Sequence, residues 1–156
     1  MQNAIGDLHQ QGQIRLDEDG RIIDSTGLSI QPDRHEINLD GRQFWTSCAY
    51  DFFGIFAALG ASGHARSVTP DTGQPVQIDF RNGQPQPAPL VLFLPDDDRA
   101  RCPNAYDQWC PNSNLFHATA ATAWATNRGL TGQVLTPTEA AERGGRAWRA
   151  LTTPPP

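Results

Sequence analysis

The fold is organised around residues 48–59, which read CAYDFFGIFAAL. The apolar residues after Asp51 fall at every helical angle, so this stretch predicts a helix that is buried on most sides. Thr46 or Ser47 is expected to cap its start, and Gly60 and Gly63 should end it. Cys48 and Asp51 are three positions apart, so a helix would place the thiol and the carboxyl group on one face, one turn apart.

This pairing suits chemistry on a soft metal that carries an organic group. A thiolate is a soft ligand, and a carboxyl group can carry a proton. The first turn of a helix should also favour the thiolate form of Cys48. Cys110, much later in the chain, could supply a second thiolate. From the residues alone, Cys48 could instead be a small buried hydrophobic side chain, and Cys110 a loop cysteine without a role.

The rest of the chain predicts short antiparallel strands and a few helices. Two β-hairpins precede the central helix and three strands follow it; the third of these, an unbroken apolar run, should lie inside a sheet. Residues 84–89 are predicted as a loop, and the irregular segment 95–111 delivers Cys110. The predicted strands are 13–16, 21–24, 35–39, 43–45, 65–69, 76–80, 90–94 and 133–135, and the predicted helices, besides the central one, are 118–127 and 137–149.

Helices and antiparallel hairpins are mixed without a βαβ rhythm, which indicates an α+β fold. The chain of 156 residues is long enough for a single compact domain. We expect antiparallel β-hairpins and a sheet flanked by helices. The expected division is an N-terminal hairpin region over residues 1–45, a core over 46–151 and a tail over 152–156.

Composition argues against several kinds of partner. The net charge of −5 argues against nucleic acid or an anionic membrane surface. No apolar run approaches the roughly 20 residues of a membrane span, and the first residues show no secretory signal. Three cysteines cannot all pair within the chain, which suits working thiols in a cytoplasmic setting.

Other residues that could carry chemistry have weaker patterns. Cys102 could be a spare thiol, a redox partner of Cys110 or a further metal ligand. The histidines lack the spacing of a zinc module, so we expect them to be structural or exposed; they are His9, His35, His64 and His117. The aromatic residues expected in the core, some of which could also line a substrate pocket, are Trp45, Tyr50, Phe52, Phe53, Phe56 and Phe93.

Several short motifs follow one another in a familiar order. FWTSCAYD at 44–51 is followed by ALG at 58–60 and ARSV at 65–68, then by CPNSNLF at 110–116, and finally by WA at 124–125, GLTG at 129–132 and VLT at 134–136. Taken together, from Gly20 to Trp148, they resemble the alkylmercury (organomercurial) lyase family. No single motif is specific, but their shared order is.

The resemblance implies a lyase of mercury resistance and detoxification. Such an enzyme cleaves the carbon–mercury bond of an organomercurial by protonolysis and gives a hydrocarbon and Hg(II). Cys48 and Cys110 would hold the metal as thiolates, with Asp51 beside it as the proton shuttle. Low-molecular-weight thiols or a mercuric reductase would then take up the Hg(II). No cofactor is implied, and Hg(II) is bound only as the product.

The chain departs from the family pattern at two places. Family members usually carry a longer helical region, resembling a winged helix, ahead of the first cysteine. Only 47 residues precede Cys48, so we expect a reduced winged-helix-like region. Asp71 stands about where family members often have a further, structural cysteine.

Two other functions are compatible with the residues. One is a non-catalytic protein that binds Hg(II) or Cu(I) on the same scaffold, although such a protein has no need of the carboxyl group of Asp51. The other is an enzyme with a cysteine nucleophile. It would need a general base, which only folding could bring close, from His64 or His117.

Overall fold

The predicted central helix exists and forms the middle of an α+β fold. The computed structural model describes residues 4–152. In it, helix α2 (Ala49–Leu59) begins directly after Cys48 and ends at Gly60, which adopts a left-handed conformation. Phe52, Phe53 and Phe56 are fully buried, and each such side chain stabilises the fold by about 1.5–3 kcal/mol.

A large antiparallel sheet supports one side of α2. Phe56 stacks on Phe80 of this sheet, with ring centroids 4.0 Å apart. Strand β7 alternates exposed and buried residues, as expected for a sheet with one face on the core. The strand order is β1-β2-β3-β5-β4-β6-β7-β8. The strands are β1 (Ile14–Leu16), β2 (Ile22–Ser25), β3 (Leu28–Ser29), β4 (His35–Leu39), β5 (Arg42–Thr46), β6 (Gly63–Val68), β7 (Pro75–Arg81) and β8 (Gln84–Pro85).

A small sheet lies at one end of the molecule, where the apolar strand β9 (Leu90–Pro95) occupies its centre as predicted. Antiparallel strands β10 (Asn114–His117) and β11 (Gly132–Leu135) flank it. Helix α4 (Ala121–Asn127) covers this sheet through Trp124, which contacts the rings of Phe93 and Phe116.

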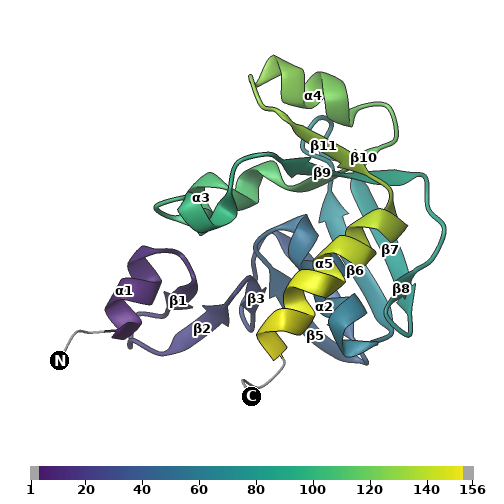
Figure 1. Ribbon diagram of the computed structural model, residues 1–156. Coiled ribbons are helices and arrows are strands. Elements are labelled where there is room, and N and C mark those ends of the chain that lie inside the picture. The colour runs from purple at the N-terminus through teal and green to yellow at the C-terminus, as the bar shows by residue number, and fades with distance from the viewer. Residues whose placement is uncertain (1–3, 153–156) are drawn as a thin grey trace.

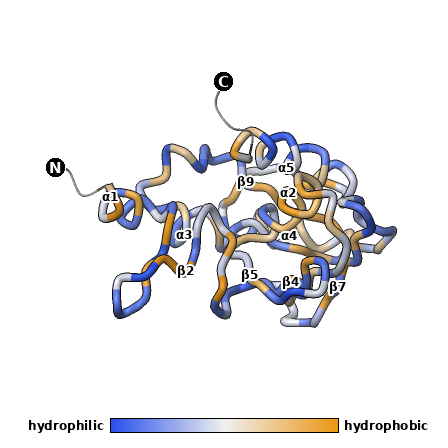
Figure 2. Tube along the Cα trace, turned by 90° about the horizontal axis from the view of Figure 1, so that it is seen from below, coloured by the Kyte–Doolittle hydropathy of each residue, from blue (hydrophilic) through white to orange (hydrophobic). Residues whose placement is uncertain are grey.

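The long helix α5 (Pro137–Thr152) covers the other side of α2 (Figure 1). Its predicted capping box forms, because Thr136 and Glu139 bond reciprocally, side chain to backbone N–H, at 3.2 and 2.8 Å. Figure 2 shows the apolar helix α2 between α5 and strands β4, β5 and β7. The start of α2, where Cys48 lies, is therefore held between helix α5 and the large sheet.

Some elements differ from the prediction. Helix α1 (Ala4–Gln10) was not expected; it has only seven residues and buries none of them, so its sequence carries no long apolar pattern. Strands β3 and β10 were also missed, and β8 occupies the start of the predicted loop 84–89. The irregular segment 95–111 contains the 3-10 helices η1 (Arg99–Arg101) and η2 (Cys110–Asn112) and the short helix α3 (Ala105–Gln108).

Both predicted hairpins form, with β1 on β2 and β4 on β5. The large sheet continues from these hairpins into β6 and β7, so the expected region 1–45 shares a sheet with the expected core. Of the expected tail, residues 153–156 lie outside the described residues. Between residues 4 and 152, no helix is long and apolar enough to cross a bilayer.

Candidate active site

The start of α2 is capped by a distant segment of the chain. Cys48 is the N-cap residue, and its side chain makes no capping bond. Ser113 supplies the caps instead: its carbonyl accepts from the Ala49 N–H at 3.1 Å, and its hydroxyl accepts from the Tyr50 N–H at 3.2 Å. The prediction that Thr46 or Ser47 caps this helix was wrong, since the Thr46 hydroxyl donates to the Cys48 carbonyl at 3.1 Å.

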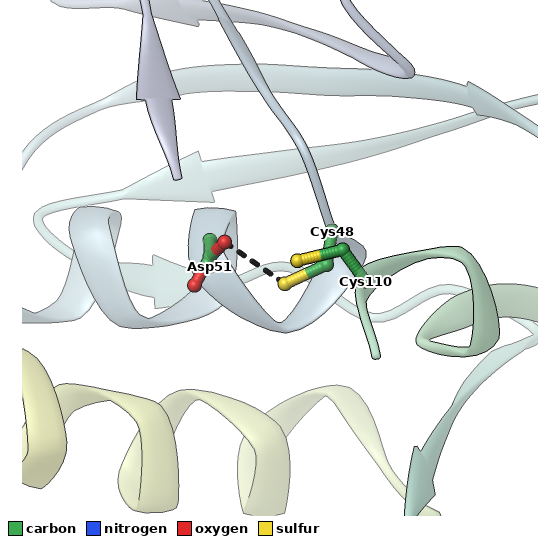
Figure 3. A group of neighbouring side chains, drawn as sticks. All are labelled: Cys48, Asp51 and Cys110. Atoms are coloured by element: carbon green, nitrogen blue, oxygen red, sulfur yellow. Dashed lines mark hydrogen bonds between the residues drawn. The ribbon is translucent and has the colours of Figure 1, made fainter. Parts of the chain in front are cut away.

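This capping docks the second thiol beside the first. Cys110 lies three residues before Ser113, so the segment that caps α2 also carries Cys110 to the helix start. One sulfur atom from each cysteine and one carboxylate oxygen of Asp51 all lie within 4.8 Å of one another. The three side chains point toward one another in Figure 3. The prediction that Cys48, Asp51 and Cys110 lie close together in the fold is confirmed.

The cluster is closed to solvent. Cys48 and Asp51 are 0% exposed and Cys110 is 1% exposed. The Cys48 thiol donates to Asp51 Oδ2 at 2.9 Å, and the Ser47 hydroxyl lies 3.6 Å from the Cys110 sulfur. A soft metal that reached the two sulfurs would lose its contact with water. It would also find the Asp51 carboxyl group in contact with one of its two ligands, the sulfur of Cys48.

Arg99 balances the charge of the cluster, and sequence reasoning missed it. Its guanidinium donates to both Asp51 oxygens, at 2.7 Å to Oδ1 and 3.3 Å to Oδ2. A buried carboxylate requires such a partner, because an unpaired one would cost several kcal/mol. That rule predicts that some cation pairs with Asp51, but the sequence does not indicate which of the twelve arginines it is.

Gly27 makes room for Asp51. It has a positive φ of 91° between β2 and β3, and a Cβ atom at this position would overlap the Asp51 carboxylate. Its carbonyl accepts from the Ser47 N–H at 3.1 Å. The carboxylate is therefore held by Arg99, by Cys48 and by the closely packed backbone of Gly27.

The two thiols differ in acidity. Burial, together with the neighbouring Cys110 and Asp51, raises the pKa of Cys48 well above its usual range. The neighbouring Cys48 side chain, with help from Arg99 and Ser47, lowers the pKa of Cys110 despite its burial. The expectation that the helix start favours a Cys48 thiolate is corrected: loss of water around the sulfur outweighs the helix dipole. Cys110 is the more acidic thiol of the pair.

The remaining candidates lie outside the cluster. Cys102 is half-buried and free, packs against the apolar cluster of Cys48, Ala105, Trp109 and Cys110 without being one of the three grouped ligands, and lines a neighbouring cavity. Within the part of the chain that the structure describes, the cluster includes no histidine. His64 is half-buried on β6 and His117 is exposed at the end of β10, and neither hydrogen-bonds to a cysteine. The arrangement therefore lacks a histidine base for a cysteine nucleophile.

Comparison with known proteins agrees with the geometry. The family model described as alkylmercury lyase matches residues 28–149. An alkylmercury lyase of Staphylococcus epidermidis is 26% identical over 136 residues, which cover 84% of this chain and 61% of that protein. One from Streptomyces lividans is 36% identical over 85 residues, or 51% of this chain and 39% of that protein.

The fold has a solved counterpart. The crystal structure of the mercury-bound form of MerB2 superposes with a TM-score of 0.84 at 26% identity, covering 96% of this chain and 73% of that one. An alkylmercury lyase of Bacillus cereus matches at 29% identity over 54% of this chain and 40% of its own length. The chain thus spans about half the length of the curated relatives it matches.

Proposed function

Because the chain belongs to the alkylmercury lyase family, we propose that it cleaves the carbon–mercury bond of organomercurial cations by protonolysis. The observation that carries this proposal is the buried cluster in which the ligand atoms of Cys48, Cys110 and Asp51 lie within 4.8 Å of one another. Two soft ligands and one proton carrier are what the reaction requires.

Metal capture comes first. The more acidic Cys110 attacks the mercury of R–Hg⁺ as a thiolate. Cys48 then binds as its proton passes along the 2.9 Å hydrogen bond to Asp51 Oδ2. The mercury now has two sulfur ligands and the organic group. The sulfur ligands raise electron density on the carbon through the metal, which makes that carbon a better base.

Bond cleavage follows. Asp51 delivers the proton to the carbon, and the electron pair of the carbon–mercury bond forms the new carbon–hydrogen bond. The hydrocarbon R–H leaves, Hg(II) remains on the two sulfurs, and Asp51 is again a carboxylate. Holding the acid next to the leaving carbon replaces a collision with an intramolecular step, an effect that can contribute several kcal/mol. Low-molecular-weight thiols then remove Hg(II) by ligand exchange.

The direct test is to incubate the purified chain with methylmercury and excess thiol. We expect methane and Hg(II) to form together, measured by headspace gas chromatography and by a mercury-specific assay. Mercury that stays bound without methane would favour the non-catalytic soft-metal binding protein. No mercury binding at all would contradict both functions.

The role of Asp51 is tested by Asp51→Asn. The amide cannot take up and deliver the proton, whereas both sulfur ligands remain. We therefore expect the variant to bind one mercury per chain and to release no hydrocarbon in a single turnover. Loss of binding together with turnover would show instead that Asp51 holds the structure of the site.

A further inference from the structure

A substrate could reach the cluster through a neighbouring cavity. This cavity has a volume of about 470 Å³, and Tyr50, Arg99, Cys102, Ala105, Trp148 and Leu151 contribute to its wall. None of the three cluster residues lines this cavity. The thiols and Asp51 are therefore separated from the cavity by other side chains.

Arg99 is the residue that belongs to both places. It lines the cavity, its side chain is 31% exposed, and its guanidinium holds the fully buried Asp51. Its Cζ atom lies 5.3 Å from the centre of the Trp109 ring, and Trp109 in turn packs with Cys48 and Cys110. The guanidinium thus occupies the approach from the cavity to the carboxylate.

The attachment of Arg99 allows it to move without disturbing the core. It belongs to η1, a three-residue 3-10 helix with no buried residue, held by Asp98 through its bond to the Ala100 N–H at 3.0 Å. The long side chain can change rotamer within the cavity while η1 keeps its place. Gly27 and α2, which hold Asp51 from the other sides, are fixed parts of the fold.

We propose that Arg99 is the gate of this site, separating the cavity from the two thiols at rest and leaving its ion pair with Asp51 when an organomercury cation enters. The identity of that cation rests on the proposed function, whereas the gate itself does not. One cation replaces another: the Arg99 guanidinium, which is paired with the Asp51 carboxylate at rest, moves away when the organomercury cation arrives. Arg99 also positions Asp51 in the resting protein.

The gate can be tested without any mercury compound. Iodoacetamide is small and neutral, so removing the charge of Arg99 does not change its attraction to the site. Arg99 also helps to lower the pKa of both thiols, so its loss would by itself slow alkylation, and a faster rate reports exposure of the thiols. Alkylation of Cys48 and Cys110 is followed by peptide mass spectrometry in a Cys102→Ser background, which removes the more accessible thiol. We expect Arg99→Ala to raise the alkylation rate of the two buried thiols by about tenfold or more, as protection by the closed state is lost.

Three variants serve as controls. Arg101→Ala changes a neighbouring arginine of η1 that is 87% exposed and pairs with Asp98, and it should leave the rate unchanged. Arg99→Lys keeps a long cationic side chain and should restore most of the protection. Ile78→Val loosens the core away from the gate, and it should not expose the thiols. Arg99→Gln replaces Arg99→Ala if the alanine variant lacks a cooperative thermal transition.

An unchanged alkylation rate in Arg99→Ala, or an equal rise in Arg101→Ala or Ile78→Val, would overturn the gate. Activity supplies a second readout: mercury binding followed by stopped flow should become faster in Arg99→Ala, while hydrocarbon release becomes slower because Asp51 has lost its positioning partner. Slowing of both steps would contradict the proposal. A wild-type chain that forms no hydrocarbon would refute the lyase function and leave the alkylation result standing.

Discussion

At the scale of single residues, the site divides its tasks between two unlike thiols. Cys48 keeps its proton because it is buried beside Cys110 and the negative charge of Asp51, whereas Cys48, Arg99 and Ser47 help Cys110 to ionise more readily. An arriving metal thus meets Cys110, which ionises readily, and Cys48, whose proton is already hydrogen-bonded to the Asp51 carboxylate. The spacing of Cys48 and Asp51 makes their contact predictable from sequence. The difference in acidity is not predictable, because it depends on Arg99 and on burial.

Replacing each of the three cysteines by serine should have clearly different effects on single-turnover cleavage. Cys48→Ser and Cys110→Ser should abolish single-turnover cleavage, since a hydroxyl is a hard ligand that cannot replace a thiolate on mercury. Cys102→Ser should leave cleavage nearly intact, because Cys102 lines the cavity and not the cluster. Hydrocarbon release from a stoichiometric complex is the measurement. Complete loss in Cys102→Ser would mean that this thiol enters the site during the reaction.

At the scale of elements, α2 carries the site because it is fixed on both sides. The sheet packs against one side. On the other side α5 lies so close that Gly144 of α5 packs directly against Gly54 of α2. The sequence predicts α2 and α5 from apolar periodicity and the capping box. It does not predict β10, a four-residue strand whose pairing with β9 depends on tertiary contacts. This strand matters, because it follows the segment that delivers Cys110 and Ser113.

Gly54→Ala should loosen the contact between α2 and α5. A Cβ atom at Gly54 would lie 2.9 Å from the Gly144 carbonyl oxygen and would overlap Trp148. Overpacking of this kind costs about 1–3 kcal/mol, more than the roughly 1 kcal/mol that alanine contributes through helix propensity. We expect a melting temperature several degrees lower, measured by circular dichroism. Ala58→Ser, at a half-buried position of the same helix, should change it little. A higher melting temperature in Gly54→Ala would contradict the close packing.

At the scale of the whole molecule, four distant segments meet at one buried point. Asp51 comes from α2 and Cys48 from the N-cap position just before it, Gly27 from the turn between β2 and β3, Arg99 from η1 and Cys110 from η2. Sequence motifs identify the residues of one segment, and the family resemblance adds Cys110. Arg99 and Gly27 become visible only in three dimensions, because their roles come from contacts across the chain rather than from spacing along it.

A buried histidine, His35, should make the stability of the molecule depend on pH. This residue is 2% exposed on β4, its Nδ1 atom lies 2.7 Å from the Ser67 hydroxyl, and its ring packs 5.9 Å from that of Phe52. Burial, with a smaller effect of Arg34, lowers the pKa of His35 from 6.5 to about 3. The unfolded chain therefore binds one more proton than the native protein between these two values.

It follows that the stability contributed by a neutral His35 is complete above pH 6.5 and is lost as the pH falls toward about 3. The expected slope is about 1.4 kcal/mol per pH unit within this window. Urea unfolding between about pH 6 and pH 4 should show this slope in the wild type and a flatter one in His35→Gln. The glutamine variant should be less stable at neutral pH, but only the difference in slope reports on the histidine, because the carboxylates contribute equally to both proteins. Parallel curves would mean that His35 can be protonated inside the folded molecule.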